Sequence, residues 1–180
     1  VIGVPLGVIA SYNKWYRDIQ NVVLDAMQTL PYFCYLIPVL MFFGGNIVSA
    51  VIATVIYSVP PIIRLTALGL SQVSGSYSEV SKSFGGTGIQ TLNKVKFPLA
   101  VPSLVMGFNQ TVIMAFAMQI VTPLIGGKGL GLQVFNALQR SDTGRGLSAG
   151  LAIVLLAIII DRITHAWTKK QRQALGLDKS

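Results

Sequence analysis

The sequence predicts an all-α membrane protein, a polytopic bundle in which about four to five helices cross the bilayer. Three observations support this fold class. The 180 residues are 52% hydrophobic and 11% charged, with a mean hydropathy of +0.64, which is too apolar for an ordinary water-soluble domain. Long apolar stretches alternate with short polar or glycine-rich segments. The cations, which give a formal net charge of +8, cluster between the apolar stretches.

The first expected span is incomplete. Residues 1–10 are apolar, and a polar link that contains aromatic residues, residues 11–20, follows them. Aromatic rings beside cations are typical of a membrane interface. The chain starts inside an apolar stretch without methionine or a signal-peptide pattern, so we expect a fragment that lacks at least one N-terminal helix.

Proline interrupts the next two expected spans. Residues 22–43 are long enough to cross the bilayer, but Pro31 predicts a kinked or partly interfacial helix. A tight turn is expected at residues 44–46 because two glycines and an asparagine stand there. Residues 47–70 then form the return span, which is broken at Pro60.

The last two expected spans differ in polarity. Residues 99–122 contain several amides, and a helix that faces lipid on every side does not tolerate so many. We therefore expect Asn109, Gln110 and Gln119 to line a translocation path or to form hydrogen bonds between helices. The final span covers residues 147–163 and is almost purely apolar.

Orientation follows from the distribution of lysine and arginine. A glycine-rich loop with a short amphipathic helix at residues 132–138 precedes the final span, and a basic tail at residues 164–180 follows it. The positive-inside rule places the more basic side in the cytoplasm. We therefore expect the tail and the polar segment at residues 76–98 to be cytoplasmic. The opposite side then holds Lys128, Arg140 and Arg145.

The segment at residues 76–98 is the longest polar stretch between spans. A hydroxyl followed three residues later by an acid or amide, as in Ser76 with Glu79 and Thr87 with Gln90, predicts two capped short helices. The glycines between them predict a turn. Each helix would carry an apolar face and a charged face.

The spacing of Glu79, Gly85 and Pro98 in this segment carries a family signal. It resembles the EAA loop of permease subunits of ATP-binding-cassette importers, in which an acid, a glycine and a proline stand at these positions. The resemblance implies that a separate ATPase subunit docks on the segment. The residues assigned to this coupling site are Glu79, Val80, Ser81, Phe84, Gly85, Val95, Phe97 and Pro98.

Five further stretches carry a second resemblance, which extends over most of the chain. They are LDAMQTLP at 24–31, PPIIRLTALGL at 60–70, GFNQT at 107–111, GGKGLGL at 126–132 and LAIIIDRIT at 156–164. These stretches resemble the permease subunits of glycine betaine/proline betaine importers. The expected function is therefore the permease subunit of an ATP-driven importer of such osmoprotectants, in the inner membrane of a bacterial or archaeal-type cell.

The resemblance also implies an architecture and a set of partners. In the type I importer fold, residues 1–180 would form a single transmembrane permease domain. Two permease copies, expected to be identical, would form the path, and two ATPase subunits would dock on the coupling loops. An extracytoplasmic binding protein would deliver the solute.

The sequence lacks the residues that several kinds of catalytic and metal-binding site require. No stretch fits the phosphate-binding pattern G-x-x-x-x-G-K-[ST], so the chain is not expected to hydrolyse ATP. One histidine and one cysteine offer no Ser/His/acid or Cys/His constellation, and we expect neither a metal nor a cofactor. The cysteine, Cys34, cannot form an internal disulfide and is expected to be a small buried side chain.

Three other interpretations stay open. The cargo could be another small organic nutrient, because the binding protein would set most of the selectivity. A secondary transporter would need no ATPase, but it would leave the spacing of Glu79, Gly85 and Pro98 without a purpose. A nucleic-acid-binding helix-turn-helix at residues 76–98 is disfavoured by the spans on both sides of it.

Overall fold

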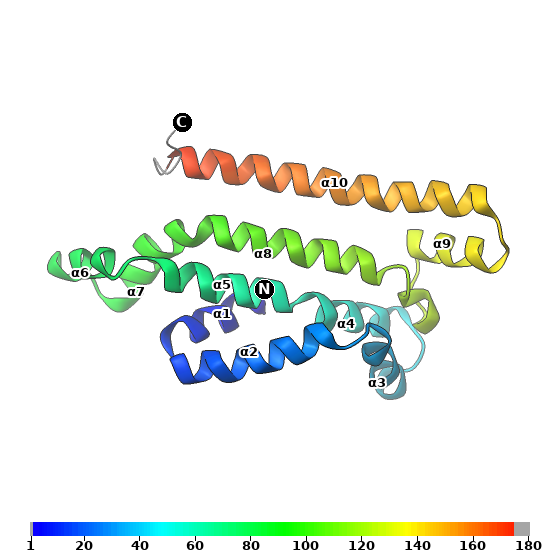
Figure 1. Ribbon diagram of the computed structural model, residues 1–180, viewed down its shortest axis with the longest axis horizontal. Helices are drawn as coiled ribbons and strands as arrows, with labels where there is room; N and C mark the ends of the chain where they lie inside the picture. The colour runs from blue at the N-terminus through cyan, green and yellow to red at the C-terminus, as the bar shows by residue number, and fades with distance from the viewer. Residues whose placement is uncertain (1, 175–180) are drawn as a thin grey trace. The chain divides into compact units, whose positions relative to one another are not determined.

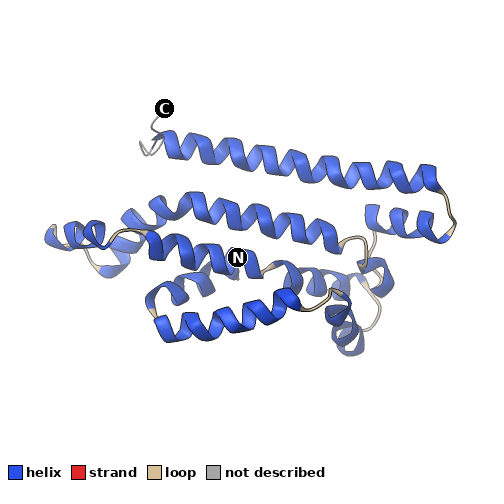
Figure 2. Cartoon of the chain, in the orientation of Figure 1, coloured by secondary structure: helices blue, strands red, loops and turns tan. Residues whose placement is uncertain are grey.

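The computed structural model describes residues 2–174, which form helices joined by short connecting segments, with no strand among them (Figure 2). The contacts divide the chain into two compact units, and each unit combines segments that are distant in sequence. The first unit contains Val1–Leu24, Pro61–Asn109 and Ile163–Ser180, and the second contains Asp25–Pro60 and Gln110–Arg162.

The all-α fold expected from the sequence is confirmed. Among residues 2–174, three helices are long and apolar enough to cross a membrane, and a bent pair of helices raises the number to four. A shorter apolar helix stands at the start of the chain. The elements in Figure 1 are α1 (Gly3–Tyr12), α2 (Lys14–Thr29), α3 (Phe33–Phe43), α4 (Ile47–Ser58), α5 (Pro60–Gln72), α6 (Gly75–Ser83), α7 (Gly88–Thr91), η1 (Leu92–Lys96), α8 (Phe97–Met118), η2 (Thr122–Ile125), α9 (Leu130–Gln139) and α10 (Thr143–Ala174).

Small residues set the helix packing in the first unit. A Cβ atom added to Gly7 of α1 would lie 2.5 Å from the Cβ atom of Thr66 in α5, and Thr66 is fully buried. A Cβ atom added to Gly69 would lie 2.6 Å from the Cβ atom of Ser103 in α8. Glycines at such positions let helix backbones approach more closely than larger side chains allow.

An apolar cluster forms the core of the second unit. The turn that precedes α4 is the expected one: Gly44 has φ +72°, and the side chain of Asn46 accepts hydrogen bonds from the N–H groups of Val48 and Ser49 at 2.8 and 3.1 Å. This cap starts α4 at the place where the helix packs against α3. The buried members of the cluster are Leu36, Val39, Ala50, Ala53, Met118 and Ile125.

The expected polar link at residues 11–20 is wrong. Helix α2 already begins at Lys14, and only Asn13 separates it from α1. The side chain of Asn13 accepts a hydrogen bond from the N–H group of Tyr16 at 3.2 Å, which satisfies a free donor in the first turn of α2. A single capping residue therefore replaces the ten-residue link.

The expected kink at Pro31 is confirmed as a sharp break. Helices α2 and α3 meet at an angle of 96°. Proline disfavours the helical conformation of the residue before it, which here is Leu30. Cys34 lies in the first turn of α3 and is exposed, so the expectation that it is buried is wrong.

The remaining spans start or end slightly beyond their expected bounds. Helices α4 and α5 together form a 26-residue span that is interrupted before Pro60, as expected. Helix α9 includes the amphipathic helix expected at residues 132–138.

Helix α10 begins before residue 147 and continues into the basic tail. The side chains of Lys170 and Arg172 and the whole of Lys179 lie outside the described part of the tail. The expected last span is therefore the middle of a longer helix.

The close approach at Gly69 gives a stability prediction. We expect Gly69→Ala to destabilise the protein by about 1–3 kcal/mol, because the added methyl overlaps the Ser103 side chain in a packed interface. The measurement is the midpoint of thermal unfolding in detergent. Gly75→Ala is the control, since no atom lies within 4 Å of the Cβ position there. Equal midpoints for the two variants would contradict the packing argument.

Candidate functional site

The polar segment at residues 76–98 folds as a helical hairpin in the first unit (Figure 1, green). Helix α6 packs against both α7 and η1, and η1 continues directly into α8. We call residues 75–96 the hairpin. It is joined to a long apolar helix without an intervening loop.

One of the two predicted helix caps is present. The side chains and backbones of Thr87 and Gln90 form a reciprocal capping box, with hydrogen bonds of 2.9 and 3.4 Å. The predicted box of Ser76 and Glu79 is wrong, because Ser74 is the N-cap of α6 and its Oγ atom accepts from the N–H group of Ser76 at 3.4 Å. The helix starts earlier than predicted, and Glu79 lies beyond its first turn.

The turn of the hairpin depends on two glycines. Gly85 has φ +77°, a left-handed conformation that glycine adopts without strain, and its N–H group donates to the carbonyl of Lys82 at 2.9 Å. The N–H group of Gly86 donates to the carbonyl of Ser81 at 2.9 Å. A Cβ atom at Gly86 would lie 2.6 Å from the Ser81 Oγ atom, so the backbone needs glycine there.

A hydroxyl pair connects the two arms of the hairpin. The Oγ atom of Ser81 in α6 lies 2.8 Å from the Oγ1 atom of Thr91 in α7. The Thr91 hydroxyl donates to the carbonyl of Thr87 at 3.0 Å, so it accepts the proton of Ser81. Thr91 is only 4% exposed. Sequence analysis assigned Ser81 to the site but missed Thr91, because hydroxyl residues ten positions apart carry no periodic signal.

The outer face of the hairpin is apolar and exposed. The exposed fraction is 53% for Tyr77, 55% for Val80, 88% for Phe84 and 74% for Ile89. Glu79 lies beside this face, is exposed, and forms no salt bridge with any residue in the described range 2–174. A partner could therefore contact an apolar surface and a carboxylate at the same time.

The C-terminal part of the hairpin packs against other residues of the first unit. Val95, Phe97 and Pro98 are half-buried where η1 becomes α8. The N–H group of Phe97 donates to the carbonyl of Leu92, the i→i−5 hydrogen bond of a π-helix, and Pro98 follows without an N–H group of its own. The Lys96 Nζ atom lies 5.3 Å from the ring centroid of Tyr12, a cation–π contact that ties η1 to α1.

The three candidate path residues have different environments. Asn109 is buried in the first unit, whereas Gln110 and Gln119 belong to the second unit and are exposed. Gln119 follows the end of α8 and lines a hollow of about 280 Å³ together with residues of α4 and the Gly127–Lys128 turn. The three amides therefore differ in burial, and Gln119 is the one that lines this hollow.

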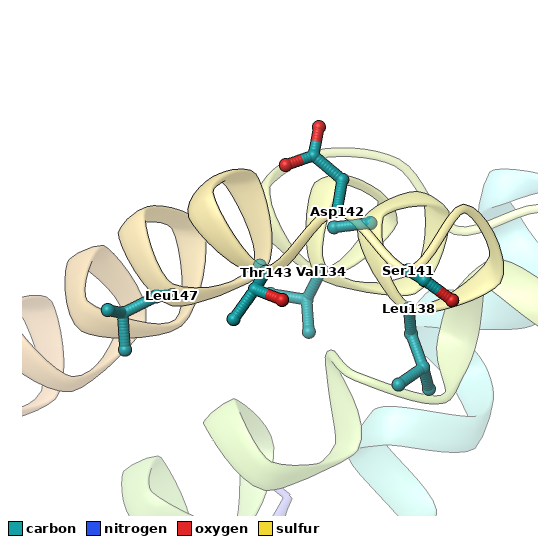
Figure 3. Close-up of a pocket in the computed structure, with 8 residues that line it drawn as sticks. Val134, Leu138, Ser141, Asp142, Thr143 and Leu147 are labelled. Carbon is teal, nitrogen blue, oxygen red and sulfur yellow. The ribbon is translucent and has the colours of Figure 1, made fainter.

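A second hollow, of about 420 Å³, lies at the turn between α9 and α10 in the second unit (Figure 3). The carboxylate of Asp142 accepts from the N–H group of Arg145 at 3.1 Å and forms a salt bridge of 3.4 Å with its Nε atom. In Figure 3, Asp142 and Leu138 point to opposite sides of the turn. The carboxylate is engaged in stabilising the start of α10.

The fold is that of an integral membrane protein, because three to four helices among residues 2–174 are long and apolar enough to cross a bilayer. Residues 3–173 match the family model described as binding-protein-dependent transport system inner membrane component. The chain belongs to this family.

Two relatives with named functions are similar in sequence to most of this chain. The chain is 45% identical over 172 residues to the glycine betaine/carnitine transport permease protein GbuB of Listeria monocytogenes. This alignment covers 96% of the present chain and 61% of GbuB. It is 44% identical over 172 residues to the glycine betaine/proline betaine transport system permease protein ProW of Escherichia coli, covering 96% of this chain and 49% of ProW. The chain thus spans about half to three-fifths of the length of these relatives.

A solved structure supports the fold independently. A chain of the MetNI methionine ABC transporter, in an inward-facing conformation, superposes with a TM-score of 0.77 at 22% identity. The match covers 92% of this chain and 85% of that one. The predicted type I importer permease fold is thereby confirmed.

The hydroxyl pair gives a prediction about local stability. We expect Thr91→Val, which keeps the shape and removes the hydroxyl, to leave the Ser81 hydroxyl without its acceptor and to loosen the hairpin by about 1 kcal/mol. Hydrogen exchange of the α6 and α7 amides in the full permease is the measurement. Ser83→Ala is the control, since Ser83 donates only to the carbonyl of Glu79 within α6. Unchanged exchange in Thr91→Val would show that the pair does not stabilise the hairpin.

Proposed function

We propose that this chain forms the membrane-spanning permease part of an ATP-driven importer for glycine betaine/proline betaine-type osmoprotectants. The names of its relatives support the cargo class. The observation that carries the proposal is the exposed apolar face of the hairpin, with Glu79 beside it, on a chain of this family. ATP hydrolysis takes place on a separate partner chain.

The hairpin is the docking element for that ATPase. An amphipathic helix that enters a groove of its partner binds through apolar anchors spaced along one face. Tyr77, Val80 and Phe84 have this spacing on α6, and the burial of an aromatic side chain such as Phe84 contributes roughly 2 kcal/mol or more. Glu79 then faces basic or polar groups of the ATPase.

A displacement of the hairpin is transmitted to the membrane-spanning helix α8 through the contacts within the hairpin and its continuous backbone. The Ser81–Thr91 hydroxyl pair holds α6 to α7, and η1 runs into α8 without a loop. When two ATPase subunits close, they pull the hairpins of two permease copies together. Because the hairpin is braced, the displacement reaches α8 and opens the path outward.

The remaining assignments complete the transport model. Two identical permease copies enclose the path, and Asn109, Gln110 and Gln119 contribute polar groups to it. The hairpin at residues 75–96 and the basic tail face the cytoplasm, as the lysine and arginine distribution indicates. An extracytoplasmic binding protein delivers cargo to the other side, which agrees with the description of the family.

Reconstituted transport tests the function directly. Proteoliposomes that contain the full-length permease and its ATPase, with the binding protein outside, should accumulate labelled glycine betaine only with ATP inside. Unlabelled proline betaine should compete. ATP-dependent uptake of a different solute would change the cargo, whereas ATP-independent betaine uptake would indicate a secondary transporter.

Charge reversal in the hairpin tests the docking role. We expect Glu79→Arg to abolish co-purification of the ATPase and to reduce uptake at least tenfold, because a docking charge is reversed while membrane insertion is unaffected. Asp18→Arg is the matched control, since it reverses another exposed acid that lies outside the hairpin. Normal uptake by well-expressed Glu79→Arg permease would count against the docking role.

A further inference from the structure

The hollow beside Gln119 has the composition of a small-solute site. It lies in the second unit and has a volume of about 280 Å³, which suits a small organic molecule. One wall is an apolar face of α4, and the other is polar. The apolar lining residues are Ile47, Ala50, Val51 and Val55, and the polar ones are Thr54, Gln119, Thr122 and Lys128. The hydroxyls of Thr54 and Thr122 donate to the carbonyls of Ala50 and Gln119, so Gln119 and Lys128 supply the side-chain donors of the hollow.

The backbone that carries Lys128 is held in place by glycines. Gly126 has φ +92°, and a Cβ atom there would lie 2.7 Å from the backbone nitrogen of Asn46, at the start of α4. A Cβ atom at Gly127 would lie 2.7 Å from the Thr122 Oγ1 atom. The turn therefore packs closely against Asn46 before α4 and against Thr122 of η2. The backbone just before Lys128 is therefore closely packed, which restricts the position of Lys128.

Gln119 is positioned in a similar way. A Cβ atom at Gly131 would overlap the carbonyl oxygen of Gln119, so only glycine allows α9 to start this close to the end of α8. The hydroxyl of Thr122 donates to the same carbonyl at 3.2 Å. The backbone of Gln119 is thus braced from two directions, at the edge of the hollow that Lys128 also lines.

The charge in this hollow is uncompensated. No acid is among its lining residues, and no salt bridge joins Lys128 to another residue in the described range 2–174. The nearest acid along the sequence, Asp142, is engaged with Arg145. The hollow therefore presents a single positive charge, an amide and an apolar wall.

We propose that this hollow is a cargo-binding site selective for zwitterions that combine a carboxylate with a quaternary ammonium group. This inference rests on the proposed import function. The Lys128 ammonium and the Gln119 amide receive the carboxylate, and Val51 and Val55 contact the methyl groups.

The same arrangement accommodates the cationic end of the cargo. The ammonium group lies farther from Lys128 than the carboxylate does, and Coulomb energy falls with distance, so attraction exceeds repulsion. Lys128 thereby becomes a specificity-determining residue that favours carboxylated cargo.

Substitutions of Lys128 in the complete reconstituted importer test the site. With saturating binding protein and ATP, we expect Lys128→Met to lower the rate of glycine betaine uptake roughly fivefold, the upper range for a solvent-exposed charge pair. Lys128→Arg should keep most of the rate because it keeps the charge. Arg140→Met is the matched control, since it removes an exposed cation outside the hollow and should transport normally.

The alternative partner for Lys128 is a carboxylate of the binding protein. A measurement of docking affinity distinguishes this partner from the carboxylate of the cargo. The affinity of the binding protein for the reconstituted importer should be equal in wild type and Lys128→Met. A loss of docking affinity would assign Lys128 to the protein partner and overturn the cargo site, as would an unchanged uptake rate in Lys128→Met. Absence of ATP-driven betaine uptake in wild type would instead refute the proposed function itself.

Discussion

The bilayer requires every backbone N–H and C=O group inside it to find a partner within the protein, and the remaining features follow from this constraint. Helices meet the requirement by themselves, so each break in a helix needs a local replacement. At the turn before α4, the Asn46 side chain supplies it by accepting from two free N–H groups. At the turn after η2, the N–H group of Gly127 donates to the carbonyl of Thr122 at 2.9 Å. Irregular segments in this chain are therefore compact and internally bonded.

Glycine has two separate roles in this architecture. Within helices, Gly7, Gly69 and Gly107 lack a side chain where another helix approaches, which lets polar hydroxyls such as that of Thr66 be buried in close contact. Outside helices, Gly85 and Gly126 adopt positive φ values that re-direct the chain. The first role holds spans together, and the second shapes the two places where a partner or a solute is proposed to bind.

Sequence reasoning predicted the short helices and the glycine turn of the segment at residues 76–98, because their signals are local, whereas the docking role of this segment stays a prediction. Glu79, Gly85 and Pro98 are separated by spacings that can be counted along the chain, and the Thr87–Gln90 box needs only four consecutive residues. The Ser76–Glu79 box was wrong because Ser74 offered a competing cap nearby, and propensity alone does not choose between them. Candidate path amides were recognised by type, but their differing exposure depends on packing around α8.

Composition and local pattern were sufficient to determine the all-α membrane class, the order of the spans, the breaks at Pro31 and Pro60 and the short helices near residues 76–98, because hydropathy, proline and glycine act on their own neighbourhood. The tertiary structure alone decided which distant groups meet. The Ser81–Thr91 pair, the Lys96–Tyr12 contact and the close approach of Gly126 to Asn46 are contacts between separate elements. The physical reason is that side-chain contacts between elements depend on how helices pack in three dimensions, which no periodicity in one segment encodes.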